Sequence, residues 1–70
     1  MRYAVVIEKA VGNYSAYVSD LPGCVATGQT LSEVESEISA AIAFHIEGML
    51  EDGLPIPPPV SQVEYVEVAA

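Results

Sequence analysis

The sequence of 70 residues predicts an α+β fold, in which an antiparallel meander of three strands is followed by one long helix and a fourth strand. Two observations carry this prediction. Residues 2–28 contain three short segments rich in β-branched and aromatic residues, with glycine-containing turns between them. From Thr30 onward, apolar residues recur every three or four positions, which is the spacing of one helix face. The expected order is β-β-β-α-β, in a single domain over residues 1–70.

The first two strands are expected at about residues 2–11 and 14–19, joined as a hairpin. Gly12 and Asn13 suit a two-residue type II′ turn between them, because glycine accepts the positive φ of its first central position. That turn sets the register. The expected neighbours are Val11 with Tyr14, Lys9 with Ala16, Ile7 with Val18 and Val5 with Asp20 on one face, and Glu8 with Tyr17 and Val6 with Ser19 on the other.

The third strand is expected at about residues 24–28, after a second reversal of the chain. Asp20 and Leu21 lead into this reversal, and Pro22 and Gly23 follow. Proline favours the second position of a type II turn, and glycine accepts the positive φ of the third. The side chain of Asp20 is expected to cap this turn.

The helix is expected at about residues 31–51. Thr30 and Glu33 have the spacing of a capping box, and Gly53 suits the C-terminal cap. The apolar face consists of Leu31, Val34, Ile38, Ala41, Ile42, His45, Ile46, Met49 and Leu50. This helix covers one face of the sheet, so the other face would present Val6, Glu8 and Tyr17.

A proline-rich connector at residues 54–60 ends the helix, because proline lacks the backbone donor and restricts the residue before it. Pro55 and Pro58 also have the PxxP spacing of an SH3-type ligand, but a rigid connector is the favoured interpretation. Residues 61–68 alternate as a fourth strand. A right-handed crossover would place it parallel to the first strand, in the order 3-2-1-4. Alternatively, the connector could carry this strand to a neighbouring chain.

The composition predicts a subunit rather than an isolated molecule. Hydrophobic residues make up 51% of the chain and charged residues 17%, against about 25% charged in an ordinary domain. A homo-oligomer, dimer or tetramer, would bury this apolar surplus. Ten acidic residues against Arg2 and Lys9 give a net charge of −8, which excludes direct binding of nucleic acid and an anionic membrane. A basic protein is the partner that this charge attracts.

The remaining signals exclude several classes of function. Cys24 is the only cysteine, which suits a reducing compartment, and neither a signal peptide nor a membrane span is visible, so a cytoplasmic location is expected. Cys24 and His45 lack neighbours that would make them a nucleophile, base or metal ligand, so no metal and no cofactor are expected. Ribonuclease H chemistry would need clustered carboxylates. The candidate carboxylates are Glu8, Glu47, Glu64 and Glu67, and no aspartate is expected in the middle of a strand. The protein is therefore not expected to be an enzyme.

The acidic residues of the helix fall into two groups. Glu33, Glu35 and Glu37 lie in the first two turns, where the helix dipole favours negative charge. Glu47, Glu51 and Asp52 lie at the other end, where the dipole disfavours it, and Glu47 and Glu51 also repel each other at i and i+4. Either this end is simply solvated, or a basic partner binds there.

Three segments resemble the N-terminal domain of the HicB antitoxin family: YAVVIEK at residues 3–9, SDLPGCVATGQT at 19–30 and MLEDGLPIPP at 49–58. The resemblance implies a β-β-β-α-β fold related to a partial ribonuclease H fold, homo-oligomers, and a basic HicA toxin that cleaves RNA and whose active site the antitoxin masks. Many HicB antitoxins continue into a DNA-binding domain, whereas this sequence has no segment that resembles one. Operator binding by this chain is therefore not expected. An orphan scaffold or binding domain without a toxin is the alternative.

Overall fold

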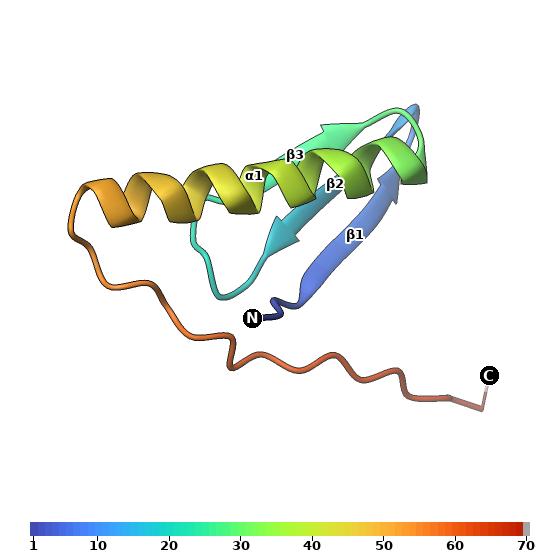
Figure 1. The fold of residues 1–70 in the computed structure, drawn as a ribbon. Coiled ribbons are helices and arrows are strands. Elements are labelled where there is room, and N and C mark those ends of the chain that lie inside the picture. The colour runs from blue at the N-terminus through green and yellow to red at the C-terminus, as the bar shows by residue number, and fades with distance from the viewer. Residues whose placement is uncertain (70) are drawn as a thin grey trace.

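The computed structural model describes residues 1–69 and confirms three antiparallel strands followed by one long helix. The strands are β1 (Val5–Ala10), β2 (Asn13–Val18) and β3 (Val25–Gly28), and the helix is α1 (Leu31–Glu51). The strands form one sheet in the order β1-β2-β3, and α1 lies across one face of it (Figure 1). Ala70 of the expected domain lies outside the described residues.

The hairpin between β1 and β2 differs from the expected register by two residues. Val11 and Gly12 form the turn, and Asn13 is already paired with Ala10 in the ladder. Gly12 takes the positive φ, +87°, at the second central position, whereas the expected II′ turn needs it at the first. The observed pairs are Lys9 with Tyr14, Ile7 with Ala16, Val5 with Val18 and Val6 with Tyr17. Because a shift of two preserves the pleat, each side chain remains on its expected face.

The connection between β2 and β3 is a tight reversal closed by backbone hydrogen bonds. The amide of Cys24 donates to the carbonyl of Leu21 at 3.0 Å, across Pro22 and Gly23, and Gly23 has a φ of +83°. This is the geometry of a type II turn, in which only the third residue needs a positive φ. The turn also places the Leu21 side chain fully inside the core.

Both ends of α1 are capped by their own sequence. Thr30 has an extended backbone, and its Oγ1 accepts a hydrogen bond of 3.0 Å from the amide of Glu33. At the other end the amides of Gly53 and Leu54 donate to the carbonyls of Leu50 and Met49, which is the Schellman arrangement, and Gly53 has a φ of +67°. These caps explain why the helix begins and ends at Leu31 and Glu51.

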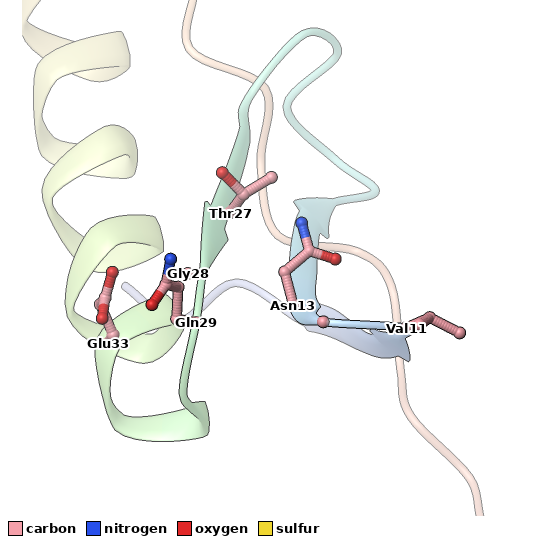
Figure 2. Close-up of a pocket in the computed structure, with 7 residues that line it drawn as sticks. Val11, Asn13, Thr27, Gly28, Gln29 and Glu33 are labelled. Carbon is pink, nitrogen blue, oxygen red and sulfur yellow. The ribbon is translucent and has the colours of Figure 1, made fainter.

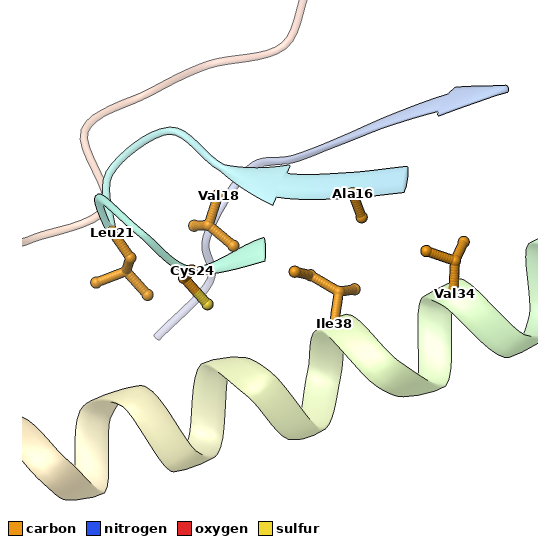
Figure 3. Packing of buried hydrophobic residues seen from close by; sticks show 6 residues of the cluster. All are labelled: Ala16, Val18, Leu21, Cys24, Val34 and Ile38. Atoms are coloured by element: carbon orange, nitrogen blue, oxygen red, sulfur yellow. The ribbon is translucent and has the colours of Figure 1, made fainter. Parts of the chain in front are cut away.

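The core lies between β2, its following turn and the first half of α1 (Figure 3). Its buried side chains are Ala16, Val18, Leu21, Cys24, Val34 and Ile38. Ala41, Ile42 and Ile46 pack against this core only in part, and the last turns of α1 extend beyond the strands (Figure 1). The helix is therefore anchored at its start and free of the sheet at its end.

Residues 52–69 form no further helix or strand in the part of the chain that the structure describes. The expected fourth strand, beside and parallel to β1, is not present within this single chain. Tyr3 donates through its hydroxyl to the carbonyl of Pro57 at 2.6 Å, and Asp20 accepts from Val60 and Ser61. These contacts hold the chain beyond the N-terminal end of β1, and from there it projects away from the sheet (Figure 1).

Candidate partner-binding surfaces

The face of the sheet opposite α1 is uncovered and carries an apolar row across all three strands. We call Val6, Glu8, Tyr17 and Val25 the open sheet face. Val6 pairs with Tyr17, and Tyr17 pairs with Val25, so their side chains share one face. Tyr17 is 42% exposed and Val25 64%. Val25 was not singled out from the sequence, although its position after the turn at Pro22 and Gly23 places it on this face.

The end of α1 carries three carboxylates. We call Glu47, Glu51 and Asp52 the acidic helix end. All three are exposed, and the last turn of the helix contains no basic residue. The helix lies on the other side of the sheet from Tyr17, so the two groups do not form one site. A single partner would contact one of these surfaces, or would have to reach around the molecule.

Asp20 holds the C-terminal segment, which differs from its expected role as the cap of its own turn. Its Oδ2 accepts hydrogen bonds from the amides of Ser61 at 2.9 Å and Val60 at 3.1 Å, and its Oδ1 accepts from the Ser61 hydroxyl at 2.8 Å. The bonds from Ser61, then that from Val60, lower the pKa of Asp20 from its ordinary value of 3.8 by stabilising the carboxylate. Local sequence gives no signal for this role, because Val60 and Ser61 lie 40 and 41 positions away from Asp20.

Cys24 and His45 are the cysteine and the histidine of the chain, and neither is expected to act as a nucleophile, base or metal ligand. Cys24 is buried, and its burial raises the pKa of the thiol, which disfavours the reactive thiolate. His45 is half-buried beside the apolar face of α1. Among residues 1–69, no group of three His, Cys, Asp or Glu side chains could hold a metal ion. Of the four carboxylates considered for ribonuclease H chemistry, Glu8 lies on β1, Glu47 lies on α1, and Glu64 and Glu67 lie in the C-terminal segment.

A pocket lies where the hairpin turn, the end of β3 and the start of α1 meet (Figure 2). It is lined by Val11, Gly12, Asn13, Thr27, Gly28, Gln29 and Glu33. Glu33 is the only carboxylate among these seven residues, and the other side chains include the hydroxyl of Thr27 and the amides of Asn13 and Gln29.

These observations define a class of protein, the small α+β domain that exposes an acidic helix end and an apolar sheet face. The family described as the HicB_like antitoxin of bacterial toxin-antitoxin systems matches residues 3–69. The chain belongs to this family. Among residues 1–69 no helix is both long enough and apolar enough to cross a membrane.

Known proteins share both its sequence and its fold. The chain is 49% identical over 57 residues to an uncharacterised 14.9 kDa protein of Haemophilus phage HP1. This match covers 81% of this chain but only 43% of the phage protein. It is 36% identical to the UPF0150 protein ssr1765 of Synechocystis, over 79% of this chain and 71% of that protein. A chain of the solved HicA3 and HicB3 toxin-antitoxin complex is 33% identical and superposes with a TM-score of 0.73, covering 84% of this chain and 70% of that one.

Proposed function

We propose that this chain is an antitoxin that binds a basic, RNA-cleaving toxin of the HicA type and covers its active site. The observation that carries the proposal is the likeness, over 84% of the chain, to a chain of a HicA3 and HicB3 toxin-antitoxin complex. The net charge of −8 supports a basic partner, because opposite charge accelerates association. We place the inhibition in the cytoplasm, whose reducing conditions suit the free thiol of Cys24.

Within this proposal, the acidic helix end is the surface on which the toxin first docks. Glu47, Glu51 and Asp52 are exposed at the end of α1 that extends beyond the sheet, so a partner reaches them without displacing any strand. Their position opposes the helix dipole, which costs stability and therefore suggests that another role retains them. The apolar open sheet face then offers a second area for contact with a partner or another copy.

The test of function is inhibition of a cognate HicA-type toxin by the purified chain. The toxin alone is expected to cleave RNA, and one equivalent of this protein is expected to stop the cleavage and to co-elute with the toxin. Full cleavage in the presence of excess folded protein, with no co-elution, would contradict the proposal.

The test of the docking surface is the triple variant Glu47→Gln, Glu51→Gln and Asp52→Asn. It should slow association with the toxin and flatten its dependence on salt, because fewer charges steer the encounter. The matched control is Glu33→Gln, Glu35→Gln and Glu37→Gln, which removes the same charge from the other end of the helix. Equal association rates for the two triple variants at every ionic strength would show that the acidic helix end is not the docking surface.

The second candidate function is a homo-oligomeric binding or scaffold domain without a toxin. The apolar row of the open sheet face favours self-association, since Val25 and Tyr17 are exposed next to each other. The two candidates differ in one measurement. A scaffold would assemble with itself and leave every basic HicA-type toxin active.

A further inference from the structure

The last described residues of the chain form an extended segment whose apolar side chains are exposed, although Val63 is half covered beside Tyr3. We call residues 62–69 the C-terminal arm. All of its residues are exposed, including Tyr65 at 94% and Val66 at 80%. Within the described chain, the last hydrogen bonds to the segment are those of Val60 and Ser61 with Asp20. A segment of β-branched and aromatic residues is thus held at its root and unpaired along its length.

The size of the molecule shows how much surface this arrangement leaves exposed. The accessible surface is 5411 Å², whereas a compact monomer of 7.4 kDa exposes about 4,200 Å². The radius of gyration is 13.8 Å, against about 11 Å for a compact chain of 70 residues. The excess, roughly 1,200 Å², is larger than the ~800 Å² that one partner buries in a standard interface.

A matching acceptor exists on the same molecule. β1 is an edge strand of the sheet, and its outer side has no neighbour within residues 1–69. An unpaired edge strand exposes backbone donors and acceptors that another strand can use. β1 has six residues, so the arm is long enough to pair with all of it.

The charges of the arm and of this edge are complementary. The only two basic residues of the chain, Arg2 and Lys9, lie just before β1 and within it. The arm carries Glu64 and Glu67. Opposite charges on neighbouring strands stabilise their pairing. The charged residues of the chain other than Arg2 and Lys9 are acidic, so they repel Glu64 and Glu67.

We propose that two copies of this chain exchange their arms, so that residues 62–68 of each copy form a fourth strand on the β1 edge of the other. The occupant is a second copy rather than the same chain, because the contacts of Pro57 with Tyr3 and of Ser61 with Asp20 aim the arm past the N-terminal end of its own β1. Exchange gives hydrogen-bond partners to the unpaired backbone groups of β1 in both copies. This inference goes beyond the inhibition of a toxin and is tested without one.

The first test uses Tyr65 and Val66, two adjacent residues of the arm that have no hydrogen-bond partner within residues 1–69 of their own chain. Only alternate residues of an edge strand donate to the neighbouring strand, so one of the two variants Tyr65→Pro and Val66→Pro removes a ladder donor, while Val66→Thr keeps both the donor and the branched side chain. The parent and Val66→Thr are expected to have the mass of a dimer by light scattering. The dimer dissociation constant of one of the two proline variants should be at least about tenfold higher, because each dimer loses a hydrogen bond at two symmetric sites. Unchanged dimer mass in both proline variants, or a monomeric parent, would overturn the proposal.

The second test distinguishes exchange from closure of the arm on its own chain. Chains with Glu8→Cys on β1 are mixed with chains that carry Glu64→Cys or Tyr65→Cys in the arm, two adjacent positions that cover both faces of the strand. Buried Cys24 stays in place. Exchange predicts a disulfide-linked species with the summed mass of the two different chains under mild oxidation. The comparison is a single chain that carries both the β1 and the arm substitution. If the disulfide forms only within this chain, the arm closes on its own β1 and the exchange is refuted.

Discussion

Two glycines show how one added methyl group can have opposite effects on stability. A Cβ at Gly28 would lie 2.6 Å from the backbone nitrogen of Val34, whereas a Cβ at Gly48 would meet nothing within 4 Å. Gly28→Ala is therefore expected to lower the free energy of unfolding by about 1–3 kcal/mol, because the start of α1 has to move away from β3. Gly48→Ala should raise it by about 1 kcal/mol, through the better helix propensity of alanine.

Urea unfolding followed by circular dichroism measures both changes. Gly48→Ala serves as the control, since it adds the same methyl group without a clash. A neutral Gly28→Ala would mean that β3 and α1 are not held as closely as the structure shows.

The attachment of Val60 and Ser61 to Asp20, just before the arm, is expected to depend on pH. Its folded-state pKa is lowered, so its contribution to stability is complete above the ordinary value of 3.8 and is lost as the pH falls through the folded value. Asp20→Asn should release residues 60 and 61 at neutral pH, and acid should do the same to the parent protein. The amide proton shifts of Val60 and Ser61 in NMR spectra report this release.

Asp52→Asn is the matched control for Asp20→Asn, because it removes one exposed carboxylate that contacts neither Val60 nor Ser61. Its amide shifts at these two positions should equal those of the parent. If Asp20→Asn also leaves them unchanged at pH 7, then the carboxylate does not hold the segment.

At the scale of the helix, the two ends of α1 should respond in opposite directions to the loss of a charge. Glu33 lies in the first turn, where negative charge is favourable, and Glu51 in the last, where it is unfavourable. Glu33→Gln is expected to lower the free energy of unfolding by roughly 0.3–1 kcal/mol and Glu51→Gln to raise it by a similar amount at low ionic strength. Thermal unfolding at two salt concentrations measures the effect, and 1 M salt should reduce both changes.

The elements were predictable to different degrees for physical reasons. α1 could be predicted because its period, N-cap at Thr30 and C-terminal Gly53 are all local signals. The expected hairpin register was wrong by two residues, because Gly12 can occupy either central position of a turn. Only the packing of the sheet decides between these two positions. The alternation in residues 61–68 indicates an extended backbone, but alternation alone does not identify the strand that such a segment pairs with.

For the whole molecule, the sequence predicted the surfaces better than their relation to one another. Exposure of Glu47, Glu51 and Asp52 follows from the position of these residues outside the apolar face of the helix. The separation of these residues from the open sheet face depends on how α1 crosses the sheet, which no local pattern specifies. The tie between Asp20 and Ser61 was missed for the same reason, because it joins segments that are distant in sequence.

The position of the core within the chain has a consequence for biosynthesis. Within residues 1–69, the six buried side chains of the core lie between Ala16 and Ile38, so the ribosome has synthesised all of them before it reaches the proline-rich connector. Neighbouring elements contact each other in sequence order, and such local contacts favour rapid folding. The core of each chain can therefore form from residues that precede the connector, and the proposed exchange of arms would not require that core to unfold.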